Sequence, residues 1–325
     1  MFSSVRRYKA DSMPAIRKNN GVKTVAGLLL LGSGLHLTLS ARPAGPSPVE
    51  AVVLGIAQDG GVPHLGCRQP LCARARRDPS AARRVASLGL VDRRAGRRFV
   101  VDATPDFVAQ VDALGGIPDG ILLTHAHIGH YLGLAGLGRE VLGAKGLPVY
   151  CTPSMARFLK ENGPWKRLVA LKNIDVREIA PGEKFALTPS LAATAIRVPH
   201  RDEDSDTVAY LFSGPGRELL WLPDIDKWEK WDRSIGELVA ERKLLAFVDG
   251  TFFSADEIPG RAIRDIPHPL ITETVARFRA APAAPAKVLF VHLNHTNKLL
   301  WDAAARRELE RKGFGIAEQG SRFPL

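Results

Sequence analysis

The sequence lacks the features that mark several classes of protein. The 325 residues contain no internal repeat and no long low-complexity tract, which excludes repeat arrays and largely disordered chains. Aromatic residues make up only 7% of the chain and no basic run is interleaved with them, so a nucleic-acid-binding stripe is not expected. The apolar run at residues 24–31 is short and is followed by Gly32, Gly34 and His36, which argues against a stable membrane span.

The charge of the chain is positive but dispersed. The formal net charge is +11, and residues 1–41 carry six basic side chains against one acid. The remaining excess is spread through pairs such as Arg76-Arg77, Arg83-Arg84 and Arg97-Arg98. We therefore expect a solvated basic surface that helps to attract an anionic small-molecule substrate, and no nucleic-acid partner.

The N-terminal region has the composition of a targeting segment. The apolar run is preceded by the basic residues Arg17, Lys18 and Lys23, and the segment closes with small residues that end at Ala41. This order predicts a signal peptide or an N-terminal anchor over residues 1–41, with translation starting at Met1 or Met13. We expect an exported, periplasmic or secreted protein whose membrane contact, if the segment is not cleaved, is made only there. Residues 42–48 are predicted to be a linker, and residues 49–325 the folded domain.

Apolar strands alternate with helical patterns along that domain, which indicates an α/β protein. The predicted strands are residues 49–57, 86–91, 98–101, 121–123, 147–151, 172–179, 192–198, 208–212, 218–222, 244–248 and 287–291. The predicted helices are residues 106–114, 153–161, 225–240, 272–280 and 301–311, the first with Thr104 as N-cap.

Three histidines lie within six residues at the end of one predicted strand. His125, His127 and His130 follow the apolar run at residues 121–123, and the chain has only nine histidines. Two imidazoles separated by one residue, followed by a third, can converge on a metal ion where the backbone leaves regular structure, as in a strand-to-helix loop. The cluster therefore predicts a metal site.

Other polar residues follow predicted strands in the same way. His200, Asp224, Asp249 and His292 each come directly after an apolar strand, where α/β folds assemble their sites. With His125 and His127, His200 would give a site of three imidazoles. Asp224 can bridge to a second metal ion, which His130 and His292 would complete.

Taken together, these motifs resemble those of the metallo-β-lactamase-fold superfamily. The likeness rests on strand-Thr-His-x-His-x-x-His, a later strand-His, a strand-Asp and a final strand-His, and extends over residues 49–325. The stretches at residues 60–77, 102–106, 247–251 and 292–297 narrow it to the subgroup of cyclic-phosphate phosphodiesterases and pyrroloquinoline quinone synthesis protein B. The resemblance implies a four-layer αββα sandwich with two mixed sheets face to face and the site at one open edge.

The resemblance also implies roles for individual residues. His125, His127 and His200 would bind the first metal ion, Asp224 would bridge, and His130 and His292 would serve the second. His268 matches a histidine that acts as acid or substrate contact in the phosphodiesterases.

Gly129 departs from the motif of the superfamily, which has an aspartate at this position. Without that carboxylate, the second position keeps two histidines and Asp224, a set that suits Fe²⁺ as well as zinc. Asp202, Asp204 and Asp206 follow His200 and are candidate substitutes. We therefore expect one or two Zn²⁺ ions, with Fe²⁺ or Mn²⁺ as alternatives.

The cysteines suggest a separate, structural site. Relatives carry Cys-x-Cys-x-x-Cys and a C-terminal histidine that together bind zinc. Cys67 and Cys72 match the outer cysteines, Gln69 replaces the middle one, and His295 matches the histidine. A structural zinc site and a local disulfide are both compatible with this pattern, and free thiols are the third alternative. Cys151 lies on a predicted strand and is expected to fill the core.

Three functions follow from these residues. The first is hydrolysis of an ester, lactone or phosphodiester by a metal-activated water, with Asp224 and His268 as the catalytic residues. The second is a metal-dependent oxidation or cofactor-related role similar to that of the quinone-synthesis branch. The third is a binder of metal or cofactor without catalysis, which the missing aspartate permits. The oligomeric state stays open, and a homodimer is compatible with the sequence.

Overall fold

The computed structural model describes residues 47–242, 244–280 and 287–325. The predicted targeting segment over residues 1–41, and all but the end of the predicted linker, lie outside these residues. Within the described part of the chain, no helix has both the length and the apolar character needed to cross a membrane.

The first of two seven-stranded sheets is built mainly from the N-terminal half of the domain. Its strand order is β14 (Arg322–Pro324), β1 (Val49–Gly55), β2 (Ser87–Asp92), β3 (Arg97–Val101), β4 (Gly120–Leu122), β5 (Leu147–Cys151) and β6 (Ile174–Glu178). The pairs from β14 to β3 are antiparallel, and those from β3 to β6 are parallel. The sheet is therefore mixed.

The second sheet is built from the C-terminal half and has a similar organisation. Its strand order is β13 (Phe314–Ile316), β12 (Lys287–Val291), β11 (Leu245–Asp249), β10 (Glu218–Leu222), β9 (Thr207–Ser213), β8 (Leu191–Val198) and β7 (Lys184–Thr188). Parallel pairs run from β13 to β10, and antiparallel pairs from β10 to β7.

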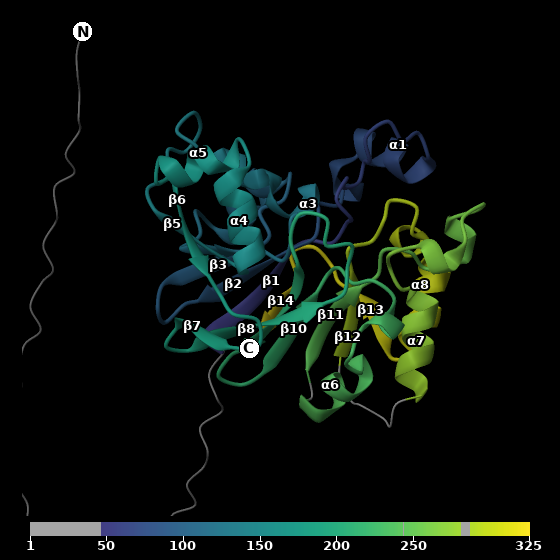
Figure 1. Ribbon diagram of the computed structural model, residues 1–325. Helices are drawn as coiled ribbons and strands as arrows, with labels where there is room; N and C mark the ends of the chain where they lie inside the picture. The colour runs from purple at the N-terminus through teal and green to yellow at the C-terminus, as the bar shows by residue number, and fades with distance from the viewer. Residues whose placement is uncertain (1–46, 243, 281–286) are drawn as a thin grey trace, which may run out of the picture. The chain divides into compact units, whose positions relative to one another are not determined.

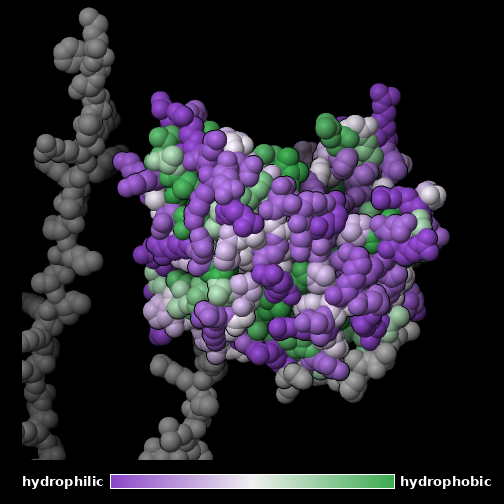
Figure 2. Space-filling view, viewed as in Figure 1, coloured by the Kyte–Doolittle hydropathy of each residue, from purple (hydrophilic) through white to green (hydrophobic). Residues whose placement is uncertain are grey.

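Helices cover the outer face of each sheet, which confirms the predicted four-layer sandwich (Figure 1). The first sheet packs against α2 (Phe107–Leu114), α4 (Pro153–Glu161) and α5 (Trp165–Ala170). The second packs against α6 (Ile235–Arg242), α7 (Ile271–Ala280) and α8 (Ala303–Arg311). Two further helices, α1 (Pro70–Arg77) and α3 (Ile128–Tyr131), lie in loops. The face seen in Figure 2 is largely hydrophilic, with apolar side chains in small separate areas.

Strand β1 shows why the strands appear in the sequence as continuous apolar runs. Val52 and Leu54 belong to the core between the first sheet and its helices, whereas Ala51 and Val53 belong to the core shared with the second sheet. A strand buried on both faces needs apolar side chains at successive positions. The two sheets are also joined by a hydrogen bond, since the Tyr210 hydroxyl donates to the Leu123 carbonyl at 2.8 Å.

Several predicted boundaries were wrong. The helix expected at residues 225–240 begins only at Ile235, because the backbone N–H groups of Ile225 and Asp226 donate to Asp249 and to the Pro199 carbonyl instead. Thr104 is not an N-cap: α2 begins at Phe107, and the Thr104 hydroxyl accepts from the Asp106 N–H. Helices α1 and α5 and strands β7, β13 and β14 were not predicted; the last two have three residues each, too few for a periodic pattern.

Strand direction brings the polar residues to one edge. In the first sheet, β1 runs parallel to β3 and β4, because each is antiparallel to β2 or parallel to its neighbour. In the second sheet, β8, β10, β11 and β12 share one direction for the same reason. The carboxyl ends of parallel strands meet at one edge of a sheet, which is where α/β folds place their sites.

Candidate metal centre

The histidine cluster lies in the loop that leaves β4. The strand ends at Leu122, His127 precedes the first turn of α3, and His130 lies within α3. His125 and His130 are almost completely buried, and their ring centroids lie 4.2 Å apart. The irregular backbone between strand and helix lets three nearby imidazoles point into one pocket.

A buried carboxylate from the neighbouring strand orients two of these rings. Asp102 follows β3 and accepts hydrogen bonds from the Thr124 N–H at 2.8 Å and from His130 Nδ1 at 2.8 Å. The Thr124 hydroxyl donates to Asp102 and accepts from His125 Nδ1 at 2.9 Å. The Nδ1 atoms of His125 and His130 are thereby engaged, which leaves their Nε2 atoms for a ligand.

The second sheet contains a matching support. Asp249 ends β11, and its Oδ1 accepts from the Thr251 hydroxyl at 2.8 Å. That hydroxyl in turn accepts from His292 Nδ1 at 3.0 Å, and Asp249 Oδ2 accepts from His268 Nδ1 at 2.8 Å. Asp249 and Asp102 are both completely buried. Each sheet therefore contributes a carboxylate and a threonine that fix the histidine rings.

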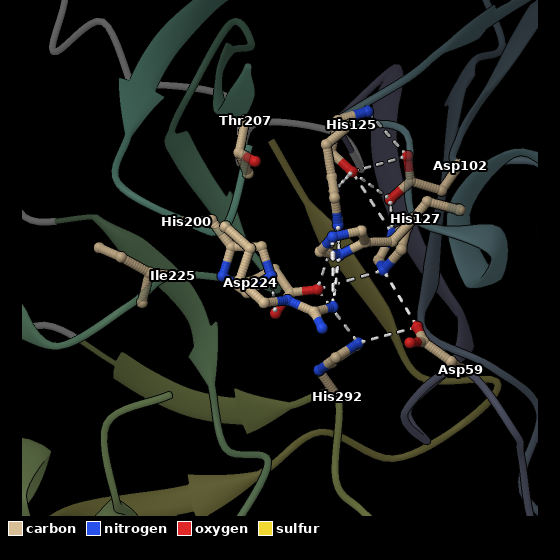
Figure 3. Close-up of polar contacts among 12 residues, drawn as sticks. Asp59, Asp102, His125, His127, His200, Thr207, Asp224, Ile225 and His292 are labelled. Carbon is tan, nitrogen blue, oxygen red and sulfur yellow. Dashed lines mark hydrogen bonds and ion pairs between the residues drawn. The ribbon is translucent and has the colours of Figure 1, made fainter. Parts of the chain in front are cut away.

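Asp224 lies at the centre of the group, two residues after β10 ends (Figure 3). Its Oδ2 is 3.3 Å from His130 Nε2, 3.4 Å from His292 Nε2 and 3.5 Å from His125 Nε2. Its Oδ1 is 3.5 Å from His200 Nε2 and 3.3 Å from His268 Nδ1. One carboxylate thus contacts five imidazoles.

Another carboxylate, Asp59, completes the second half of the centre. It lies in the loop after β1, and its Oδ1 is 3.4 Å from His130 Nε2 and 3.5 Å from His292 Nε2. Figure 3 shows Asp59 across from Asp224, with His292 between them. Burial raises the pKa of Asp59, but the neighbouring imidazoles of His130 and His292 hold it well below its usual range.

The donor atoms fall into three overlapping groups, each with its members within 4.8 Å of one another. His125, His127, His200 and Asp224 form one group; Asp59, His130 and His292 form another; and Asp224, His268 and His292 form the third. The structure therefore brings together all six histidines and the aspartate that the sequence assigned to the site. Asp59 is added to them.

The acids expected to substitute for the missing aspartate are elsewhere. Asp202 accepts a hydrogen bond from the Thr207 hydroxyl, Asp206 pairs with Arg197 at 2.7 Å, and Asp204 is exposed. Their loop follows β8, and none of the three belongs to a donor group of the centre. The sequence prediction for these three residues was therefore wrong.

His127 has a different environment from the other rings. Its Nδ1 lies 2.8 Å from His125 Nε2, and its Nε2 bonds to Glu203 Oε2 at 2.8 Å. Arg201 Nη2 lies 3.2 Å from both ring nitrogens of His127. The ring therefore directs Nδ1 toward the pocket and Nε2 toward a partly exposed carboxylate.

Burial and neighbouring charges set the protonation of the centre. Burial, together with the positive charge of His130, holds the pKa of His125 well below its usual value, and burial lowers the pKa of His200 to about 4. Burial raises the pKa of Asp224, but the surrounding histidines outweigh it and hold that pKa well below its usual range. Burial opposes charge on His130 too, yet Asp102 raises its pKa well above the usual value. A metal ion that binds His130 Nε2 would displace the proton from this nitrogen.

The residues fit a divalent metal ion. His130 Nε2, His200 Nε2, His292 Nε2, Asp224 Oδ1 and Asp59 Oδ1 are all buried and have no hydrogen-bond partner. Two ligands at about 2.0–2.1 Å from a tetrahedral zinc ion lie about 3.3 Å apart, which is the spacing observed among these atoms. Because buried polar atoms are normally paired, the unpaired set indicates ligands that await a cation.

The cysteines are less well gathered. All three cysteines of the chain are free thiols (Cys67, Cys72 and Cys151), so the structure contains no disulfide between Cys67 and Cys72. Among the described residues, no group of three donor atoms within 4.8 Å includes Cys67, Cys72 or His295. His64 stacks on His295 with ring centroids 4.2 Å apart, and the backbone N–H of His64 donates to Cys72 Sγ at 3.3 Å. A zinc ion at this place stays a prediction, with His64 as an additional candidate ligand.

Sequence reasoning missed several residues that shape the centre. Asp249 was placed among the strand-end residues of the site but was given no role, and Asp102, which also follows an apolar strand, entered only through the stretch at residues 102–106. Asp59 follows a strand too, directly before Gly60-Gly61, and an acid at such a turn could have been included on the same ground.

Comparison with known proteins places the chain in context. Residues 97–293, more than half of the chain, match the family model of the beta-lactamase superfamily domain. Coenzyme PQQ synthesis protein B from Methylobacterium sp. (strain 4-46) is 26% identical over 308 residues, covering 85% of this chain and 100% of that protein. The same protein from Pseudomonas paraeruginosa (strain DSM 24068 / PA7) is 29% identical, covering 84% and 99%.

Solved structures with the same fold include a quinone-synthesis protein and a diphosphatase. Zn²⁺-bound PqqB from Methylobacterium extorquens has a TM-score of 0.72 at 23% identity and covers 85% of this chain and 100% of its own. A diphosphatase of the PhnP family has a TM-score of 0.64 at 21% identity, covering 85% and 97%. These likenesses support the predicted sandwich.

Proposed function

Because this chain belongs to the beta-lactamase superfamily, we propose that it is a metal-dependent hydrolase of an ester, a lactone or a phosphodiester. The observation that carries the proposal is the set of buried, unpaired nitrogen and oxygen atoms around Asp224. Such a set costs stability unless a cation binds it, so a binding role for the ion explains why the chain maintains it.

The centre has enough donors for one or two ions. His125, His127 and His200 would hold the first, His130 and His292 the second, and Asp224 would contact both. When bound, zinc, or Fe²⁺ or Mn²⁺ in its place, would supply an activated water and polarise the oxygen of the bond to be cleaved.

His268 is the candidate acid. Its Nδ1 is held by Asp249 at 2.8 Å and lies 3.3 Å from Asp224, so Nε2 is the nitrogen that remains to donate a proton to the leaving oxygen. Burial lowers the pKa of His268, but Asp249 and Asp224 raise it above its usual value overall. A raised pKa keeps a proton on the ring to higher pH, which suits a donor.

An anionic small molecule is the substrate we propose. Arg201 lies over the exposed edge of His127, with 45% of its side chain accessible, and its guanidinium is paired only loosely with Glu203 at 3.6 Å. A guanidinium beside the metal position can bind a carboxylate or phosphate with two parallel hydrogen bonds.

The test is a panel of phosphodiesters, carboxylic esters and lactones assayed with zinc-, manganese- and iron-loaded protein. We expect turnover of at least one class, lost with chelator and reduced about 10²–10⁴-fold in His268→Gln. Glu161→Gln is the control, because this exposed residue of α4 is not part of the centre. Absence of turnover on every class with the metal bound would contradict the proposal.

A second candidate function comes from the curated relatives. Their name, coenzyme PQQ synthesis protein B, and their coverage of the chain favour a cofactor-related role, for which the metal donors of the centre make a metal-dependent oxidation the candidate reaction. The stretch at residues 249–251, which resembles the quinone-synthesis branch, supports His268 and His292 in this structure, and this support is compatible with either chemistry. Iron as the bound metal together with oxygen consumption would favour this second function over hydrolysis.

Export is part of the proposal. The basic residues and apolar run of residues 1–41 support an exported, periplasmic or secreted protein, cleaved after the small residues near Ala41. Fractionation of cells that express the full chain, with N-terminal sequencing of the product, tests it.

A further inference from the structure

The space beside Gly129 is already occupied by another side chain. A Cβ atom built on Gly129 would lie 2.1 Å from Asp59 Oδ1 and 2.7 Å from Asp59 Cγ. Real Cβ atoms do not approach other atoms so closely, so no side chain fits at position 129 while Asp59 is in place. The glycine that removes the aspartate of the superfamily motif therefore also makes room for an aspartate from a different part of the chain.

The carboxylate of Asp59 is directed at the second metal position. Its Oδ1 is buried without a hydrogen-bond partner, and it lies 3.4 Å and 3.5 Å from the Nε2 atoms of His130 and His292. The Nδ1 atoms of both rings are engaged by Asp102 and Thr251. The three atoms thus have the spacing of ligands around one ion rather than that of a hydrogen-bonded network.

The loop that carries Asp59 is fixed to the strand end that carries His292. The Gln58 N–H donates to the Leu293 carbonyl at 2.9 Å, and the Leu293 N–H donates to the Ile56 carbonyl at 2.8 Å. Gly61 closes the loop with a positive φ of 63°, a conformation that favours glycine. The position of Asp59 opposite His292 therefore follows from backbone pairing.

From these observations we propose that Asp59 is a ligand of the second metal ion, and that it replaces, from the loop after β1, the carboxylate that Gly129 removes from the histidine motif. The second position then has four donors (Asp59, His130, His292 and Asp224), and the centre holds two ions. This inference shares with the proposed function the premise that a divalent ion binds, but it does not depend on hydrolysis.

Metal content tests the assignment independently of any substrate. Purified wild-type protein equilibrated with buffered zinc should bind two ions at the centre. Asparagine has the same shape as aspartate, and about a third of the Asp59 side chain is exposed, so Asp59→Asn should fold normally. This variant should bind one ion, with affinity for the second lowered at least ~100-fold. Asp204→Asn, an exposed acid of the loop after His200, is the matched control and should still bind two. Two ions in Asp59→Asn at wild-type affinity would overturn the assignment.

A zinc ion at the cysteines would be additional to the two of the centre, and it is excluded from the count by introducing Cys67→Ser and Cys72→Ser into the parent protein and into every variant. If hydrolysis is never found but Asp59→Asn loses one ion, the proposed function fails and this inference stands.

A separate experiment tests whether the Asp59 side chain occupies the space beside Gly129. It measures the midpoint of thermal unfolding of the metal-free protein. Gly129→Ala should lower the midpoint in the wild-type background and lower it by less in an Asp59→Gly background, because the side-chain contacts at 2.1 Å and 2.7 Å are gone and only the 2.8 Å contact with the Cα atom of residue 59 remains. Equal, additive decreases in the two backgrounds would show that the Asp59 side chain does not occupy this space, and would overturn the replacement of the motif carboxylate by Asp59.

Discussion

The two halves of the metal centre are built in different ways. In the first half, His125 and His127 come from one loop, and only His200 is brought from another strand. In the second half, Asp59 and His292 come from opposite ends of the domain and meet His130 in the middle. The first half is therefore a local motif with a tertiary addition, and the second is tertiary almost throughout.

The supports that the two sheets contribute are nevertheless alike. Asp102 with Thr124, in the first sheet, and Asp249 with Thr251, in the second, each engage histidine Nδ1 atoms at the carboxyl ends of strands. Two sheets of similar topology thus reach the same solution to one physical problem, which is to leave Nε2 available on a ring of fixed orientation. Ligand identity differs between the halves, but the supported rings of His125, His130 and His292 are oriented in the same way.

Removal of the residue common to both halves should have the largest effect. Asp224→Asn should lower the affinity for both ions and reduce any hydrolysis by at least about 10³-fold, because a bound ion contributes several kcal/mol to transition-state stabilisation. Metal analysis and the substrate panel measure the two effects. A variant that keeps both ions would show that Asp224 is not shared between the halves.

Variants of the two supporting carboxylates should distinguish the two halves, with smaller losses of metal affinity than Asp224→Asn causes. Asp102→Asn should weaken both positions by about 10–100-fold, because Asp102 orients His130 directly and His125 through Thr124. Asp249→Asn should weaken only the second position. Competition with a chromophoric chelator gives both affinities.

Asp119→Asn is the control for these two variants, because this residue pairs with Arg97 on the surface. The comparison of supports would be refuted if Asp102→Asn and Asp249→Asn had the same effect on both positions.

A change between the sheets should alter stability without altering metal content. Tyr210→Phe removes the donor to the Leu123 carbonyl and should lower the free energy of unfolding by about 1–2 kcal/mol, because both groups are buried. Denaturant unfolding of the metal-free protein measures the change. Tyr150→Phe, whose hydroxyl contacts only the exposed Arg177 at 3.3 Å, should change it by less than about 0.5 kcal/mol. Loss of a metal ion in Tyr210→Phe would indicate that the contact orients the site as well.

The smallest effect is expected at the rim of the first half. Glu203→Gln removes the charge that accepts from His127 Nε2, but half of the glutamate side chain is exposed. Exposed pairs contribute about 0.2–1 kcal/mol, so affinity for the first ion should fall by no more than about fivefold. Isothermal titration with zinc measures this, and a decrease as large as that of Asp102→Asn would mean that Glu203 orients His127 as strongly as a buried acid.

Much of the fold could be predicted because its signals are local. Strand β5 and helix α4 have the predicted boundaries, since an apolar run and a Pro153 first turn are readable without tertiary context. The helix after β10 could not be placed, because the backbone at Ile225 is bonded to a residue from another strand. The substitute carboxylate was sought in the wrong loop for the same reason: closeness in sequence to His200 does not determine closeness in space.

By itself, the sequence determined the strand ends and the chemistry available there. Apolar runs end at histidine and aspartate, and two imidazoles one residue apart already define half of a metal site. Only the tertiary structure decided which acid faces Gly129. Backbone pairing of the loop after β1 with the segment after β12 places Asp59 within 3.5 Å of His292, and that pairing depends on the assembly of the whole sandwich.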